Sequence, residues 1–247
     1  MLAQFKGGKL LIYFQPKFKA QTLELVGMEA LLRLKDERGN VLLPTFLSTL
    51  YQQGLSKAID SKVIDLVFEQ VIAWRKSGIS IPTISINFDK DFLLDKLAVN
   101  QFINRSKTHN LHFYIEITEH TYTVQLEALA SVIIKLRDAG HKISIDDFGA
   151  GYSCLTSLLT LNADEIKLDR QLVVPPQGEL GRGQILLKSS IDLCHELGFC
   201  VVAEGVETKA QLEFLQTCGV DIIQGYHLGK PMHPDEIVSL FHHFVGR

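Results

Sequence analysis

Residues 143–153 read ISIDDFGAGYS, an alternating apolar run that ends in two adjacent aspartates and a glycine-containing turn. Asp146 and Asp147 repel each other, and each loses hydration if the strand is buried, so the pair needs a compensating charge. A bound cation is the obvious candidate. On a regular strand the two side chains point to opposite faces. Gly149 and Gly151 permit a turn that brings Asp147 back beside Asp146.

Strand-like runs recur on both sides of this stretch and alternate with helical patterns. This order favours parallel pairing, with both faces of the sheet covered. About eight strands in 247 residues predict an α/β fold, a (β/α)8 TIM-like barrel, with an open doubly wound sheet as the alternative. The expected strands are 10–16, 24–34, 83–88, 113–118, 143–147, 165–169, 200–205 and 221–226; the expected helices are 57–77, 124–139, 183–198 and 208–218; and 173–183 is expected to be a mobile loop at one rim.

The composition predicts a single domain over residues 1–247, since 46% of the residues are hydrophobic. Lys and Arg total 25 against 28 Asp and Glu, a net charge of -3, which gives no electrostatic basis for binding long nucleic acid or an anionic membrane. The four cysteines have no CxxC spacing and are expected to be reduced. No apolar stretch is long enough for a signal peptide or a membrane span. We expect a soluble, cytoplasmic protein or the cytosolic domain of a larger one.

Most of the expected strands are apolar until their last residues, which are carboxylates, amides or a lysine. In a barrel the carboxyl ends of the strands meet on one face, where catalytic groups usually lie. A single Glu at such a position is more often a hydrogen-bonded structural residue, but six or more on successive strands indicate a shared site. These residues are Glu29, Asn87, Glu116, Asp146, Asp147, Lys167, Asp169, Glu204 and Gln224.

Carboxylate and amide oxygens favour Mg²⁺ or Mn²⁺, and the histidines do not fall at strand ends, which argues against zinc. Five carboxylates carry more charge than one divalent ion neutralises, so we expect two ions that share a carboxylate. Paired ions suit an in-line displacement at phosphorus, with Lys167 orienting the attacking water or neutralising a phosphate oxygen. The chain has neither a P-loop nor a G-x-G-x-x-G fingerprint. The residues alone predict a two-metal phosphoester hydrolase and leave the ester open.

Seven motifs in order, GMEALLRL, SINF, YIEITEH, SIDDFGAGYS, EIKLDR, VVAEGVET and IIQGY, resemble those of the EAL-domain phosphodiesterases, which hydrolyse the bacterial second messenger cyclic di-GMP. The resemblance runs from residue 13 to residue 232. It implies a (β/α)8 barrel with one strand antiparallel to the others. It also implies hydrolysis of cyclic di-GMP to linear 5′-pGpG by a metal-activated water at the C-terminal face of the barrel, and a homodimer formed through the loop after Asp147.

The resemblance also implies a role for each site residue. The two ions would be Mg²⁺ or Mn²⁺, Lys167 would orient the water, and Asp169 and Gln224 would lie beside it. Glu119 would anchor the loop after Asp147, with Glu207 in the outer shell of the site. The implied substrate contacts are Gln15 and Arg33, and the implied metal ligands are Glu29, Asn87, Glu116 and Asp146 for one ion and Asp147 and Glu204 for its neighbour.

Two other functions remain open on the same barrel. The first is a catalytically silent cyclic di-GMP receptor or protein-interaction module, since many family members have lost activity together with metal ligands. This chain keeps every one of those ligands. The second is a proton-abstracting enzyme of the enolase type, for which a lysine near strand-end acids is suitable. The adjacent Asp146 and Asp147 and the Asn87 ligand favour paired ions at a phosphate instead.

Overall fold

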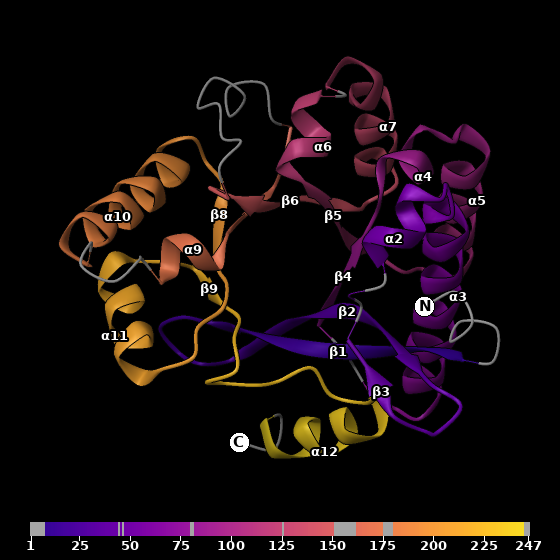
Figure 1. Cartoon of the computed structure of the whole chain (residues 1–247), viewed down its shortest axis with the longest axis horizontal. Helices are drawn as coiled ribbons and strands as arrows, with labels where there is room; N and C mark the ends of the chain where they lie inside the picture. Colours follow the sequence, from indigo (N-terminus) through magenta and orange to yellow (C-terminus); the bar gives the residue numbers. More distant parts are fainter. Residues whose placement is uncertain are drawn as a thin grey trace.

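Eight strands close into a barrel, and helices surround it (Figure 1). The computed structural model describes residues 8–43, 45, 47–79, 82–124, 126–150, 162–174 and 180–244. The strands are β1 (Lys9–Lys19), β2 (Leu25–Lys35), β3 (Val41–Leu42), β4 (Thr83–Asn87), β5 (Phe113–Thr118), β6 (Lys142–Phe148), β7 (Glu165–Leu168), β8 (Cys200–Ala203) and β9 (Ile222–Ile223).

The strand order around the barrel is β1-β9-β8-β7-β6-β5-β4-β2, and pairing of β1 with β2 closes the ring. Strand β1 is antiparallel to both of its neighbours, whereas the other barrel strands run parallel to one another. β3 pairs only with the end of β2. The predicted barrel with one reversed strand is therefore confirmed, and closure of the ring rules out the open sheet.

Neighbouring strands of the barrel are joined by very different numbers of residue pairs. Ten residue pairs join β1 to β2, from Lys9–Lys35 to Phe18–Leu25. In contrast, β9 is joined to β1 by two pairs and to β8 by two pairs. β9 is thus the most lightly held strand of the ring.

Among the described residues, helices lie in the connections from β3 to β4, β4 to β5, β5 to β6, β7 to β8 and β8 to β9, and one helix follows β9. All four predicted helical regions are helical, and the region 124–139 corresponds to the end of one helix and the whole of a second. The helices are α2 (Leu47–Gln52), α3 (Ser56–Lys76), α4 (Lys90–Leu94), α5 (Lys96–His109), α6 (Glu119–Val124), α7 (Leu126–Asp138), α9 (Arg170–Val173), α10 (Leu180–Glu196), α11 (Lys209–Cys218) and α12 (Pro234–Phe244).

Two substantial helices were not predicted from the sequence. In α5 the Asp95 side chain caps the helix by accepting a hydrogen bond from the Ala98 amide at 2.9 Å, and the helix buries Val99 and Phe102 on one face. In α12 Pro234 occupies the first position, where its missing N–H costs nothing. This helix lies against β1, at the bottom of the view in Figure 1.

The predicted loop at 173–183 is wrong at its C-terminal end. Residues 180–183 form the first turn of α10, and the same helix buries Leu187 and Ile191 farther along. Residues 175–179 lie outside the described part of the chain. Among the described helices, none combines the length and the apolar character needed to cross a membrane.

The strand register brings the carboxyl ends of neighbouring strands to one level. Asn87 of β4 lies opposite Glu116 of β5, and Thr118 lies opposite Asp146 of β6. The apolar residues between these strand ends are buried, Ile115 and Ile145 among them. The polar residues predicted at the strand ends therefore lie together at the end of a layer of buried apolar side chains.

Candidate metal centre

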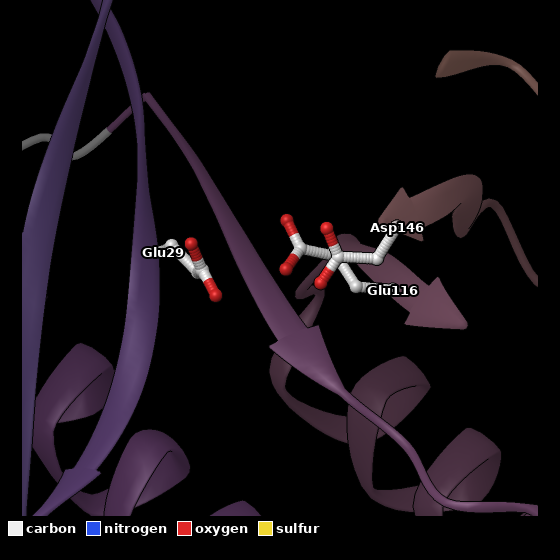
Figure 2. A group of neighbouring side chains, drawn as sticks. All are labelled: Glu29, Glu116 and Asp146. Carbon is white, nitrogen blue, oxygen red and sulfur yellow. The ribbon is translucent and has the colours of Figure 1, made fainter. Parts of the chain in front are cut away.

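Three carboxylates from three different strands meet at the mouth of the barrel. Figure 2 shows Glu29 of β2 facing Glu116 of β5 and Asp146 of β6. One oxygen of each lies within 4.8 Å of an oxygen of the other two. Glu116 and Glu29 are almost completely buried, with 1% and 6% of their surface exposed. Such oxygens are close enough to bind one cation together.

A second group of acids shares Asp146 with the first. It consists of Asp146, Asp147 and Glu204, again with one oxygen of each within 4.8 Å of the others. Asp147 has a left-handed backbone, with φ 58°, and its amide donates a hydrogen bond to Asp146 Oδ1 at 3.0 Å. This local turn places the two neighbouring aspartates together, as the sequence predicted. Gly149 has φ 93°, whereas Gly151 lies outside the described residues.

The Lys167 ammonium lies at the centre of both groups. Its Nζ atom is 2.7 Å from Glu204 Oε1, 2.9 Å from Glu116 Oε2, 3.0 Å from Asp146 Oδ1 and 3.4 Å from Glu29 Oε2. Lys167 comes from β7 and is 1% exposed. One positive charge therefore faces four carboxylates.

The electrostatics of the centre follow from burial and this imbalance of charge. Burial raises the pKa of Glu29 and of Asp146, and it raises the pKa of Glu204 to about 8 even though Lys167 opposes the shift. Burial lowers the pKa of Lys167, but the surrounding carboxylates outweigh it and hold this pKa well above its ordinary value. The centre has too little positive charge for its acids.

Glu116 is the exception among these acids. Burial raises the pKa of Glu116, but Lys167 and Lys17 together outweigh it and lower this pKa to about 2. Lys17 donates to Glu116 Oε1 at 2.7 Å, on the side away from Lys167. Glu116 is therefore held as a carboxylate by two ammonium groups.

The residues fit a hard divalent cation. Carboxylate oxygens are the ligands that Mg²⁺ and Mn²⁺ prefer, and a shortage of positive charge is what a cation relieves. Asn87 Nδ2 donates to Glu29 Oε1 at 2.9 Å, so its amide must rotate to offer an oxygen to an ion. The acids that could bind metal are thus brought together, while the identity of the ion stays a prediction.

Two glutamine side chains connect Glu29 to the neighbouring strands β1 and β9. Gln224, which follows β9, donates from Nε2 to Glu29 Oε2 at 2.6 Å and to Gln15 Oε1 at 3.2 Å. Gln15 of β1 donates in turn to the Gly229 carbonyl at 3.1 Å. The Gln224 Oε1 atom is buried without a hydrogen-bond partner among the described residues. Both predicted residues therefore lie beside the acids that could bind metal.

The remaining predicted residues lie farther out. Asp169 caps α9 by accepting from the Gln171 amide at 2.8 Å, and its charge raises the pKa of Asp147 in addition to burial. Glu119 Oε2 accepts from the Gly149 amide at 3.3 Å, which ties it to the start of the loop after Asp147. The rest of that loop, residues 151–161, lies outside the described part of the chain.

Glu207 lies at the rim of the site, whereas Arg33 is buried, with 6% of its surface exposed, and is not among the residues that line the larger cavity. Glu207 forms an ion pair with Arg170 at 2.9 Å, and both side chains are substantially exposed. Arg33 donates to the Leu32 carbonyl at 2.8 Å and lies over the Tyr13 ring at 5.7 Å. Burial lowers the pKa of Arg33, which remains a cation.

Sequence reasoning missed a polar layer directly beneath the acids. It consists of Lys17 of β1, Ser85 of β4, Ser144 of β6 and Glu165 of β7, all buried. Lys17 donates to Ser85 Oγ at 2.7 Å, and Ser144 donates to Glu165 Oε1 at 2.8 Å. The signal was present in β1, because Gln15 and Lys17 alternate with the apolar Phe14 and Phe18.

Two cavities adjoin the acidic residues. The first, of about 330 Å³, lies over Glu29, Asp146, Lys167 and Glu204 and reaches Tyr226 at the rim. The second, of about 240 Å³, begins at Asn87 and Glu116 and is lined mainly by apolar side chains. Its other lining residues include Ala30, Leu32, Leu47, Tyr51, Ile59, Val63 and Phe88.

Comparisons with known proteins place this geometry in a family. A family model described as the EAL domain matches residues 1–231. The chain is 32% identical over 238 residues to the bifunctional diguanylate cyclase/cyclic di-GMP phosphodiesterase MucR of Pseudomonas aeruginosa, and 34% identical over 233 residues to the oxygen sensor protein DosP of Escherichia coli. These matches cover 94% and 93% of the chain but only 34% and 29% of the relatives, so the chain spans about a third of their length.

A solved structure shows the same fold. The structure of the PaMucR phosphodiesterase in complex with c-di-GMP superposes with a TM-score of 0.83 at 32% identity. The match covers 92% of this chain and 94% of that one.

Proposed function

The chain belongs to the EAL-domain family, and we propose that it hydrolyses cyclic di-GMP to linear 5′-pGpG at the acidic mouth of its barrel. One observation carries the proposal: two groups of acids share Asp146 around a single lysine. A receptor that needs no metal has no use for this concentration of buried negative charge. The names of the relatives support the choice of substrate.

Two divalent cations held here would activate a water molecule and stabilise the oxygens of an in-line displacement at phosphorus. Glu29, Asn87 and Glu116 would hold one ion, and Asp147 and Glu204 would hold the other. Asp146 belongs to both groups of acids and would be shared between them.

Lys167 has a different role once the acids are neutralised. It then no longer serves as the counter-charge of four carboxylates, and its ammonium remains buried at the floor of the larger cavity. From that position Lys167 would orient the attacking water or neutralise a non-bridging phosphate oxygen. Gln15 and Arg33 would contact the substrate, and the planar guanidinium suits a phosphate.

The two cavities suit a ligand with a phosphodiester core and flat bases. The larger one lies over the acids, where the scissile phosphate would be placed. The apolar one opens beside Asn87 and Glu116 and offers a surface for an aromatic base. Dimerisation through the loop after Asp147 stays a prediction, since residues 151–161 lie outside the described part of the chain.

The test is a chromatographic assay with cyclic di-GMP and Mg²⁺ or Mn²⁺, run beside Glu29→Ala. Metal-dependent 5′-pGpG that disappears in Glu29→Ala supports the proposal. Tight nucleotide binding without product would instead support the silent receptor on the same barrel. Neither binding nor product would mean that the substrate is wrongly assigned.

A further inference from the structure

Lys17 is a second buried lysine, one layer below the acids. It projects inward from β1 and is 4% exposed. Three acceptors face its ammonium group: Ser85 Oγ at 2.7 Å, Glu116 Oε1 at 2.7 Å and Glu165 Oε1 at 3.6 Å. The first two contacts are hydrogen bonds, and the third is an ion pair that is too long for a hydrogen bond.

The two oxygens of Glu116 face different lysines. Oε1 accepts from Lys17 at 2.7 Å, and Oε2 accepts from Lys167 at 2.9 Å. Lys167 is shared with Glu29, Asp146 and Glu204, so an arriving cation can take its place on Oε2. Lys17 lies below the acids, and its ion pairs within the described chain are with Glu116 and Glu165. Oε1 therefore stays with Lys17 when Oε2 turns to a metal.

We propose that Lys17 is a positioning residue that limits Glu116 to one metal-facing oxygen and thereby favours Mg²⁺ or Mn²⁺ over Ca²⁺ at this centre. Mg²⁺ requires near-ideal octahedral geometry with short bonds, which single carboxylate oxygens satisfy. Ca²⁺ takes six to eight oxygens at longer distances and often binds both oxygens of a carboxylate. An oxygen already held by a buried ammonium group is not available for that second bond. This inference rests on the proposed function, because it takes Glu116 as a metal ligand.

Three single variants distinguish the effect of the hydrogen bond to Glu116 Oε1 from the effect of the positive charge of Lys17. Lys17→Met removes the charge and the donor, Lys17→Gln removes the charge but keeps a donor for Glu116 Oε1, and Ser85→Ala removes only the neutral partner of Lys17. Lys17→Met also removes the ion pair of Glu165, which then keeps its hydrogen bond from Ser144. If Lys17→Met does not fold, the double variant Lys17→Met/Glu165→Gln replaces it, because this variant removes one charge of each sign. Folding of each variant is checked by circular dichroism and thermal unfolding.

The readout is the dissociation constant of each ion, measured by isothermal titration calorimetry with Mg²⁺, Mn²⁺ and Ca²⁺ and without substrate. For Lys17→Met we expect the preference for Mg²⁺ over Ca²⁺ to fall about tenfold, which is about 1.4 kcal/mol of differential binding. Ser85→Ala is expected to keep the wild-type preference, and Lys17→Gln to retain most of it.

Each contrary result has a distinct meaning. An unchanged ratio of Mg²⁺ to Ca²⁺ affinity in a folded Lys17→Met protein, even with both affinities weakened, overturns the inference and leaves Lys17 with a structural role. Equal changes in Lys17→Met and Lys17→Gln also overturn it, because charge rather than position would then be responsible. No binding of any ion to the wild type would overturn the metal centre and the proposed function together.

Discussion

Replacing Lys167 by methionine tests the electrostatic account of the site most directly. Lys167 is fully buried and pairs with four carboxylates at 2.7 to 3.4 Å. Removing one partner of a buried ion pair costs about 3–5 kcal/mol, because the remaining charge is left without compensation. The four contacts do not add, since acids with raised pKa values such as Glu29 and Glu204 can take up protons instead.

We therefore expect Lys167→Met to lower the stability of the metal-free protein by about 3–5 kcal/mol. For a chain of this size each kcal/mol lowers Tm by about 2–4 °C, so Tm should fall by roughly 6–20 °C in the presence of EDTA. The matched control is Lys188→Met. Lys188 forms an exposed i,i+4 pair with Asp192 on α10, and losing such a pair costs about 0.3–0.5 kcal/mol.

Two conditions should reduce the effect of Lys167→Met. Saturating Mg²⁺ supplies the missing positive charge and should recover part of the lost Tm. Lowering the pH from about 8 to about 5 should narrow the gap to wild type, because the pKa of Glu204 is raised to about 8 and this acid then becomes neutral. The reasoning is refuted if Lys167→Met and Lys188→Met unfold at the same temperature in EDTA.

Three further outcomes are expected. Glu29→Ala should abolish turnover of cyclic di-GMP while leaving the metal-free Tm equal or higher, since one buried like charge is gone; more than about a tenth of the wild-type rate in the chromatographic assay would contradict this. Burial raises the pKa of Asp60 from 3.8 to about 7. The folded chain therefore holds a proton that the unfolded chain has lost, and this contribution to stability is complete below about pH 4 and lost as the pH rises through about 7, by up to ~1.4 kcal/mol per pH unit. Asp60→Asn should remove that slope from urea unfolding measured at several pH values, and an identical slope in both proteins would disprove the assignment. A Cβ on Gly225 would overlap the Val206 backbone, so Gly225→Ala should cost about 1–3 kcal/mol in urea unfolding, whereas Gly181→Ala, with open space around it, should change stability by less than about 1 kcal/mol in either direction.

The strands were predictable because each carries its signal locally. Runs such as ISI before Asp146 and VVA before Glu204 are short, apolar and followed by polar residues, and the recurrence of eight strand-like runs between helical patterns is typical of a barrel. The reversal of one strand was expected only from the family resemblance, and the structure identifies that strand as β1. Strand direction depends on partners far away in the chain, such as Ile223 beside Phe18, and no local pattern encodes them.

Helix α5 was missed although its signals are present. Asp95 is a good capping residue, and Val99, Phe102 and Ile103 have helical spacing. The residues of α5 are polar on average, and this overall polarity concealed the narrow apolar face of the helix. Lys17 was missed for a related reason, because an inward lysine in a strand looks like a solvated one until its partner Glu116 is placed opposite it.

The light attachment of β9 has a consequence for motion. Two residue pairs on each side hold this strand, and Gln224, the next residue, donates to Glu29. Local openings of a protein draw on its least protected backbone hydrogen bonds, at free energies below that of global unfolding. Amide exchange should therefore be faster in β9 than in β5. Each such opening would release Glu29 from Gln224 while the other strands of the barrel stayed paired, so the hydrogen bonds of the acidic centre can change without global unfolding.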